Sequence, residues 1–154
     1  LFFEKGMVLF IRILIDADGC PVVDIAVSAA KIYQIECVIL CDTSHVFEKE
    51  GAQTVTVSKG ADSVDFALVN RIKRGDIVVT QDYGLAAMCL AREAVILNQD
   101  GMVYHGDNIN SLLTQRHTAK KLRNAGGRTK GPSKRTPEQD RLFEEALSRI
   151  LAQT

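Results

Sequence analysis

The sequence ILIDADGCP, residues 13–21, combines the end of a buried strand, a polar turn and the start of a helix. Its apolar beginning predicts a strand over residues 8–15. Pro21 suits a helix start, because its φ is fixed and it lacks the N–H that a first turn leaves unpaired. Asp16 and Asp18 follow the strand directly, in a bend that Gly19 and Pro21 favour. Ligands of open parallel sheets bind beyond the carboxyl ends of the strands, so this stretch predicts an α/β fold with acidic side chains in its cleft.

The sequence IVVTQD, residues 77–82, repeats this arrangement later in the chain. It predicts a strand over residues 77–81, followed by a helix from Gly84 to Arg92. The hydroxyl of Thr80 could hold a metal-bound water or a phosphate oxygen, and the carboxylate of Asp82 could bind a metal. The structural alternative is that Asp82 only caps the following helix.

Asp62 and Asp65 open a further helix, expected over residues 62–74. The buried side of this helix is expected to carry Phe66, Ala67, Val69 and Ile72. The two aspartates either stabilise the helix N-terminus, as an N-cap and a first-turn acid, or join the acids that follow the strands.

Carboxylates that meet in one cleft repel one another and raise one another's pKa. A divalent cation removes that conflict, and oxygen ligands suit Mg²⁺ or Mn²⁺. We therefore predict a metal-dependent site for phosphodiester cleavage. Its metal ligands would be Asp16, Asp18, Asp65 and Asp82, and its catalytic residues would be these four together with Asp62 and Thr80.

Strand and helix patterns alternate along the first two thirds of the chain. Further strands are expected over residues 37–41, 53–57, 94–97 and 102–104. The alternation predicts a mainly parallel sheet with helices on both faces. Cys37 and Cys41 share one face of a strand, which favours a role in the core. The four cysteines form no CxxC pair, and this usage fits a reducing cytoplasm.

The composition is that of an ordinary globular protein, with 154 residues, 46% hydrophobic and 25% charged. No apolar run is long enough to cross a membrane. The apolar first ten residues are interrupted by Glu4 and Lys5 and are not followed by a small-residue cleavage site, so they make a poor signal peptide. We expect a cytoplasmic protein with no membrane partner.

Charge is divided unevenly between two regions. Residues 1–107 have a net charge of −6, and residues 108–154 have a net charge of +6. A basic segment beside an acidic body suggests a polyanion partner, which we expect to be nucleic acid. The expected nucleic-acid contacts are Arg116, Lys120, Arg123, Arg128, Lys130, Lys134 and Arg135. The alternative is a solvated tail that balances the body. No aromatic pattern typical of base-stacking RNA modules is present.

The basic region predicts two helices joined by a loop. The first helix is expected over residues 110–123, and Thr136, Pro137 and Gln139 form a capping box for the second. The second helix has an apolar stripe that must be buried, either on the body of the same chain or on a second subunit in a homodimer. We therefore divide the chain into an α/β domain over residues 8–107 and a basic helix-loop-helix extension over residues 108–154, packed on the same domain.

The motifs quoted above, with Gly60-x-Asp62-x-x-Asp65 and the tail pattern Gly131-Pro132, resemble the YaiI/YqxD family of uncharacterised bacterial proteins. The similarity extends from about Ile11 onward. That family in turn resembles PIN-like nuclease domains. This resemblance implies a three-layer sandwich with an acidic cleft that binds Mg²⁺ or Mn²⁺ and cleaves single-stranded RNA or other flexible nucleic acid. It also implies that Asp16 and Asp82 match the PIN acids after the first and fourth strands.

Two features depart from the PIN pattern. PIN domains commonly have a glutamate in the middle of the chain, whereas this chain offers Asp62 or Asp65. The basic C-terminal extension also lies outside the usual PIN core.

Two other functions fit parts of the sequence. A hydrophobic-Asp-x-Asp-Gly motif also opens phosphohydrolases of the haloacid dehalogenase type, in which Asp16 would be the nucleophile and Asp18 the acid/base. Cys20 stands where that motif usually has Thr or Val, and the lysine and later acidic pair that it needs are not identifiable. The third function is a non-catalytic RNA-binding module, which needs the basic segment alone.

Overall fold

The computed structural model describes residues 2–4, 7–60, 62–126 and 133–154. Its strands are β1 (Phe2–Glu4), β2 (Met7–Leu9), β3 (Arg12–Asp16), β4 (Glu36–Asp42), β5 (Gln53–Val57), β6 (Ile77–Val79) and β7 (Val95–Leu97). Its helices are α1 (Val23–Tyr33), α2 (Ser63–Arg71), α3 (Tyr83–Ala91), α4 (Gly106–Asn124) and α5 (Pro137–Ala152). The expected alternation of strands and helices is confirmed.

The central sheet has five strands, all parallel, in the order β5-β4-β3-β6-β7. The chain builds outward from β3 through β4 to β5. It then returns to the other side of β3 to form β6 and β7. The strand order therefore reverses between β3 and β6, which is the position where open parallel sheets bind their ligands.

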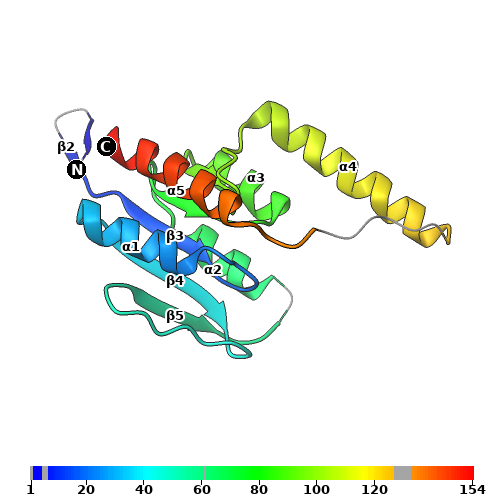
Figure 1. Cartoon of the computed structure of the whole chain (residues 1–154), viewed down its shortest axis with the longest axis horizontal. Coiled ribbons are helices and arrows are strands. Elements are labelled where there is room, and N and C mark those ends of the chain that lie inside the picture. Colours follow the sequence, from blue (N-terminus) through cyan, green and yellow to red (C-terminus); the bar gives the residue numbers. More distant parts are fainter. Residues whose placement is uncertain (1, 5–6, 61, 127–132) are drawn as a thin grey trace.

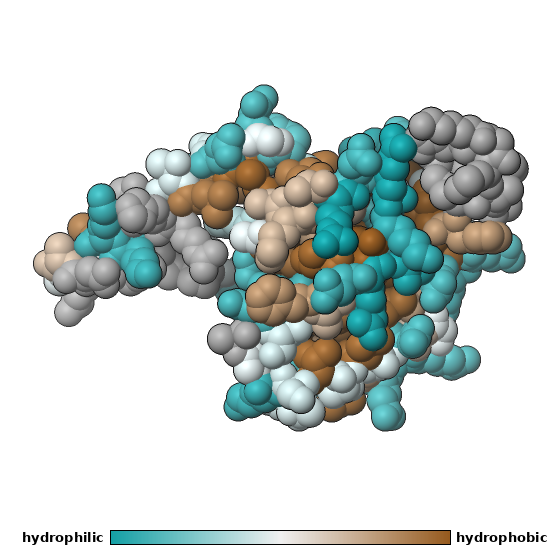
Figure 2. All heavy atoms as spheres, turned by 180° about the vertical axis from the view of Figure 1, so that it is seen from behind, coloured by the Kyte–Doolittle hydropathy of each residue, from teal (hydrophilic) through white to brown (hydrophobic). Residues whose placement is uncertain are grey.

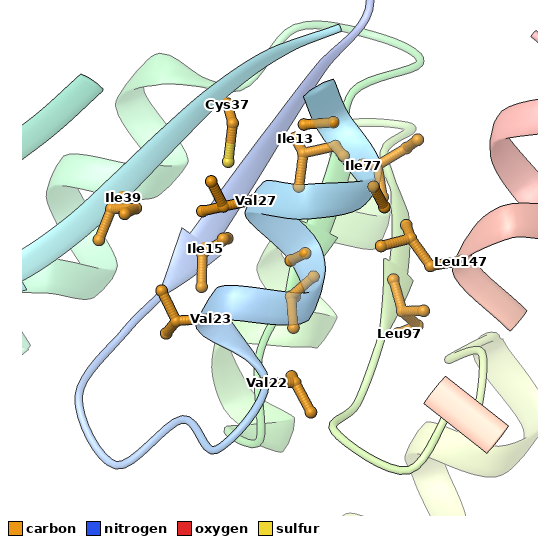
Figure 3. Packing of buried hydrophobic residues seen from close by; sticks show 14 of the residues in the cluster. Ile13, Ile15, Val22, Val23, Val27, Cys37, Ile39, Ile77, Leu97 and Leu147 are labelled. Atoms are coloured by element: carbon orange, nitrogen blue, oxygen red, sulfur yellow. The ribbon is translucent and has the colours of Figure 1, made fainter. Parts of the chain in front are cut away.

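Helices cover both faces of this sheet (Figure 1). On one face, α1 and α5 pack on side chains such as Ile13, Ile39 and Leu97, and Figure 3 shows α1 lying across these strands. On the other face, α2, α3 and the first part of α4 pack on the alternate side chains of the same strands, among them Leu14 and Val78. Both faces are apolar because a parallel sheet is buried on both sides. Cys37 and Cys41 are buried in the first of these layers, as expected.

The amphipathic helix α5 buries its apolar stripe on the body of its own chain, which is one of the two arrangements that the sequence allowed. Phe143, Leu147 and Leu151 are buried against the layer that contains α1. The predicted capping box is present at the start of α5, formed by Thr136 and Gln139. Docking of α5 thus completes the cover over one face of the sheet.

Several expected boundaries are wrong, each for a physical reason. The single strand expected over residues 8–15 is divided, because residues 7–9 pair with residues 2–4 as a separate antiparallel hairpin. Residues 102–104 form only an isolated bridge between Val103 and Leu97, since an Asx-type turn at Asn98 directs the chain back for one pair only. Helix α2 ends at Arg71, three residues earlier than expected. Phe66 was expected to be buried but is 61% exposed, because α2 buries Val64 and Leu68 instead. Ile72, directly after the helix, is buried as expected.

Among the described residues, no helix combines the length and the hydrophobicity that crossing a bilayer requires.

Candidate active site

A cleft of about 610 Å³ opens at the carboxyl edge of the sheet, where the strand order reverses. It is lined by residues that follow β3, β4 and β6 and by the first turn of α2. Six aspartates line it, namely Asp16, Asp18, Asp42, Asp62, Asp65 and Asp82. The structure therefore brings together all five aspartates that the sequence singled out and adds a sixth.

A hydrogen bond from a buried threonine positions the carboxylate of Asp16. It is the last residue of β3, and its Oδ2 accepts a hydrogen bond of 2.7 Å from the hydroxyl of Thr80. Thr80 is itself buried, accepts a hydrogen bond from the backbone N–H of Asp82 at 3.0 Å, and receives the Tyr104 hydroxyl on its carbonyl oxygen at 3.2 Å. The hydroxyl of Thr80 donates its only proton to Asp16. Thr80 therefore orients the Asp16 carboxylate from the buried side of the cleft.

The electrostatics of the cleft disfavour negative charge on Asp16. The pKa of Asp16 is raised to about 6, chiefly by burial and further by the nearby Asp65, Asp82 and Asp18, against the lowering effect of the Thr80 hydrogen bond. The effect of the neighbours is the mutual repulsion expected of carboxylates that share one cleft.

Asp18, just after β3, and Asp42, the last residue of β4, also line the cleft. Burial raises the pKa of Asp18, and the charge of Asp42 adds to that effect. Hydrogen bonds from Ser44, one from its hydroxyl and one from its backbone N–H at 2.8 Å, lower the pKa of Asp42. Asp42 lines the cleft but was not among the site residues predicted from the sequence. The signal was its position, because it ends β4 just as Asp16 ends the neighbouring strand β3.

Asp62 and Asp65 lie at the start of α2. Asp62 occupies the N-cap position with φ of 62°, in the left-handed region, and its side chain makes no capping hydrogen bond. The capping role considered for Asp62 is therefore not realised. Burial raises the pKa of Asp65, with additional effects from Asp82 and Asp62. Both residues line the cleft together with the other acids.

Asp82 fulfils the structural role that was considered for it and also lines the cleft. Its Oδ1 accepts hydrogen bonds from the backbone N–H groups of Gly84, at 2.8 Å, and Leu85, at 3.1 Å. It thereby caps α3, which begins at Tyr83. Capping fixes the carboxylate at the cleft, so the two roles are compatible.

The donor chemistry of the cleft suits a hard divalent cation. The lining residues, all within the described part of the chain, supply carboxylates and include neither lysine nor arginine. Within the described residues, no three acidic, histidine or cysteine side chains converge closely enough to ligate one ion together. Mg²⁺ can bind through one or two carboxylates while keeping several waters, so at most two carboxylates of the described residues could ligate one such ion directly.

The expected nucleic-acid contacts that the structure describes lie on α4 and just before α5. Arg116, Lys120 and Arg123 belong to α4, whose C-terminal part projects away from the sheet (Figure 1). The side chains of Lys120 and Lys134 are exposed. Arg128 and Lys130 lie outside the described residues.

Arg135 has a clear structural role. Its Nη1 and Nε form ion pairs with Asp100, at 2.9 Å, and with Asp140, at 2.7 Å, while its Nη2 donates to the carbonyl oxygen of Gln99 at 2.6 Å. These bonds tie the start of α5 to the turn after β7.

Comparison with known proteins places the chain among bacterial relatives. A UPF0178 protein of Exiguobacterium sibiricum is 51% identical over 142 residues, covering 92% of this chain and 97% of the relative. Similar proteins of Ruminiclostridium cellulolyticum and Clostridium acetobutylicum are 51% and 46% identical over 136 and 142 residues, covering 88% and 91% of this chain and 89% and 96% of the relatives. No solved structure shows a significant match. The family model described as "Uncharacterized BCR, YaiI/YqxD family" matches residues 14–153, so the chain belongs to the YaiI/YqxD family.

Proposed function

We propose that this protein is a metal-dependent nuclease that hydrolyses phosphodiester bonds in single-stranded RNA or other flexible nucleic acid. The observation that carries the proposal is the gathering of six aspartates in one cleft at the point where the strand order reverses. An all-parallel sheet with an acidic carboxyl edge also supports the likeness to PIN-like nuclease domains.

In this proposal, Asp16 and Asp82 are the principal ligands of Mg²⁺ or Mn²⁺. Asp18 and Asp65 would complete the shell through metal-bound waters, because no three acidic side chains of the described residues converge on one ion, and Asp62 would position water. A bound divalent ion supplies an activated water and stabilises charge on the phosphate oxygens. Thr80 acts through Asp16, because its hydroxyl holds the Asp16 carboxylate in place.

The charge of the cleft makes the metal necessary for substrate binding. Phosphate would be repelled by a cleft that carries six carboxylates and no lysine or arginine among its lining residues. The exposed side chains of Lys120 and Lys134 lie in the basic region and would attract the strand in a salt-dependent manner. The acidic cleft and the basic extension thus have separate tasks: the cleft catalyses hydrolysis, and the extension captures the nucleic-acid strand.

The composition of the cleft lining disfavours a haloacid-dehalogenase-type phosphohydrolase. That mechanism places a lysine beside the nucleophilic aspartate, and the lining of this cleft offers none among the described residues.

The test is cleavage of labelled single-stranded RNA and DNA by the purified protein in Mn²⁺, Mg²⁺ or EDTA, beside Asp16→Asn. Asp107→Asn is the matched control, because Asp107 is an exposed carboxylate at the start of α4, outside the cleft. Cleavage that requires metal, is lost in Asp16→Asn and persists in Asp107→Asn is expected. Salt-sensitive binding without cleavage would instead indicate an RNA-binding module, and a phosphorylated Asp16 would indicate the phosphohydrolase.

A further inference from the structure

An exposed aromatic side chain lies directly beside the acidic cleft. Phe66 on α2 is 61% exposed, and Met88 on α3 is 37% exposed. Together they line a groove of about 340 Å³ between these two helices, which also includes Leu85. Large hydrophobic side chains exposed next to a cleft indicate a binding surface more often than isolated ones do.

The groove is continuous with the cleft. Asp62, Asp65 and Asp82 line both of them. A ligand held in the cleft would therefore extend directly into the groove. Figure 2 views the molecule from behind and shows hydrophobic surface exposed between hydrophilic side chains on that face.

Resting on the function proposed above, we propose that this groove binds one unpaired base of the strand whose phosphate lies in the cleft, with the base stacked on Phe66 and Met88. Bases stack on aromatic side chains irrespective of sequence, because every base has a π face. The thioether of methionine also makes favourable contacts with aromatic rings. A base inside a duplex has both faces stacked already, so the groove selects single strands over duplexes.

The groove also discriminates among bases by their edges. The side-chain polar atoms that line it are all carboxylate oxygens, which accept hydrogen bonds and donate none when ionised. Amino groups of adenine, cytosine and guanine can donate to such an edge. Uracil and thymine present one N–H between two carbonyl oxygens, and these oxygens face repulsion from the carboxylates.

Asp62 is the residue placed to make this distinction. It holds a left-handed backbone conformation at the N-cap of α2, yet its carboxylate does not cap the helix. A non-glycine residue in that conformation is strained, and such strain is retained where the surrounding structure holds it in place. The side chain is thereby left at the junction of cleft and groove.

The test is fluorescence anisotropy of labelled oligo(A), oligo(C) and oligo(U), single-stranded and as duplexes, in Ca²⁺, which oxygen ligands also bind. Phe66→Ala should weaken single-strand binding roughly 5- to 100-fold, as expected for loss of one stacked base. Phe66→Tyr, which keeps the ring, should bind as the wild type does. Phe10→Ala is the matched control, because Phe10 is 74% exposed and lies outside the groove. Asp62→Asn should reduce the preference for oligo(A) and oligo(C) over oligo(U).

The outcomes separate this inference from the nuclease proposal. Binding that depends on Phe66 without any cleavage in Mg²⁺ or Mn²⁺ would keep the base site and refute the nuclease. Equal binding and cleavage by wild type and Phe66→Ala would keep the nuclease and overturn the base site. An unchanged base preference in Asp62→Asn would overturn the role of Asp62, and absence of both binding and cleavage in the wild type would overturn both proposals.

Discussion

The acidic cleft makes the metal-free protein less stable than its fold allows, and Asp16→Asn should relieve this. Asparagine keeps an oxygen that can accept the hydrogen bond of 2.7 Å from Thr80, so the substitution removes charge and little else. It also removes one negative charge that acts on the neighbouring carboxylates. We therefore expect the variant to be more stable than the wild type near neutral pH in the absence of metal.

The magnitude follows from the pKa of Asp16, which is about 6 in the folded protein against an ordinary value of 3.8. As the pH rises between these values, the unfolded chain releases its proton while the folded protein retains it, so the free energy of unfolding falls. The loss is absent below the unfolded pKa and complete above the folded pKa. Two pKa units correspond to about 3 kcal/mol, which for a chain of this size is about 6–12 °C in Tm.

Urea denaturation in EDTA at pH of about 4 and about 8 would measure the difference between variant and wild type. The difference should be below about 1 kcal/mol at the lower pH and about 3 kcal/mol at the higher pH. Asp107→Asn, outside the cleft, should show no such pH-dependent gain. If Asp16→Asn has the same stability as the wild type at both pH values, burial and repulsion do not raise the pKa of Asp16 as inferred.

Three further predictions concern metal, a buried ion pair and a glycine. Mn²⁺ at about a hundredfold over its Kd should stabilise the wild type by about 2.7 kcal/mol, and Asp16→Asn by less. Metal affinity measured by calorimetry should fall below pH of about 6, because protons then compete with the metal for Asp16. Asp76 is buried and pairs with Arg12 at 2.9 Å, so Asp76→Ala should lower the free energy of unfolding measured in urea by about 3–5 kcal/mol. Asp76 precedes β6 and so lies at the end of the sheet opposite the cleft, and the variant should therefore keep its Mn²⁺ affinity. A large loss of Mn²⁺ affinity would contradict this placement of the metal site. Gly101 has φ of 85°, and an added Cβ would lie 2.6 Å from a backbone oxygen of α5, so Gly101→Ala should lower Tm more than Gly75→Ala, which has a similar φ of 86° but open space around it.

The strand-end acids could be predicted from the sequence because their signals are local. Asp16 and Asp82 each follow an apolar run and precede a helix. In a parallel sheet, every strand of this kind ends at the same edge. Their position at one edge of the sheet therefore required only the fold class, whereas their meeting in one cleft depends on the pairing of β6 with β3. The capping box at Thr136 is local in the same sense, and the structure has it where it was expected.

The remaining features depend on contacts that are distant in the sequence. Asp42 joins the cleft because β4 pairs with β3 directly, and strand order is not encoded in any single segment. Phe66 was expected to be buried, since an apolar residue at helical spacing usually is. The face of α2 that is buried is decided by its contacts with the sheet and with α3, and these select Leu68. The apolar run at residues 8–15 likewise does not reveal that residues 7–9 pair with a preceding segment.

The position of β3 in the sheet has a consequence for synthesis of the chain. β3 pairs with β4 through a short connection, but its other neighbour, β6, begins only at Ile77. While the chain is being made, β3, β4 and β5 can assemble first, which leaves the unpaired N–H and C=O groups of β3 exposed along an apolar edge. The central strand of the finished sheet is thus, for part of translation, an open edge that can pair with another nascent chain. Slowing synthesis between residues 57 and 77 should therefore promote aggregation of the nascent protein.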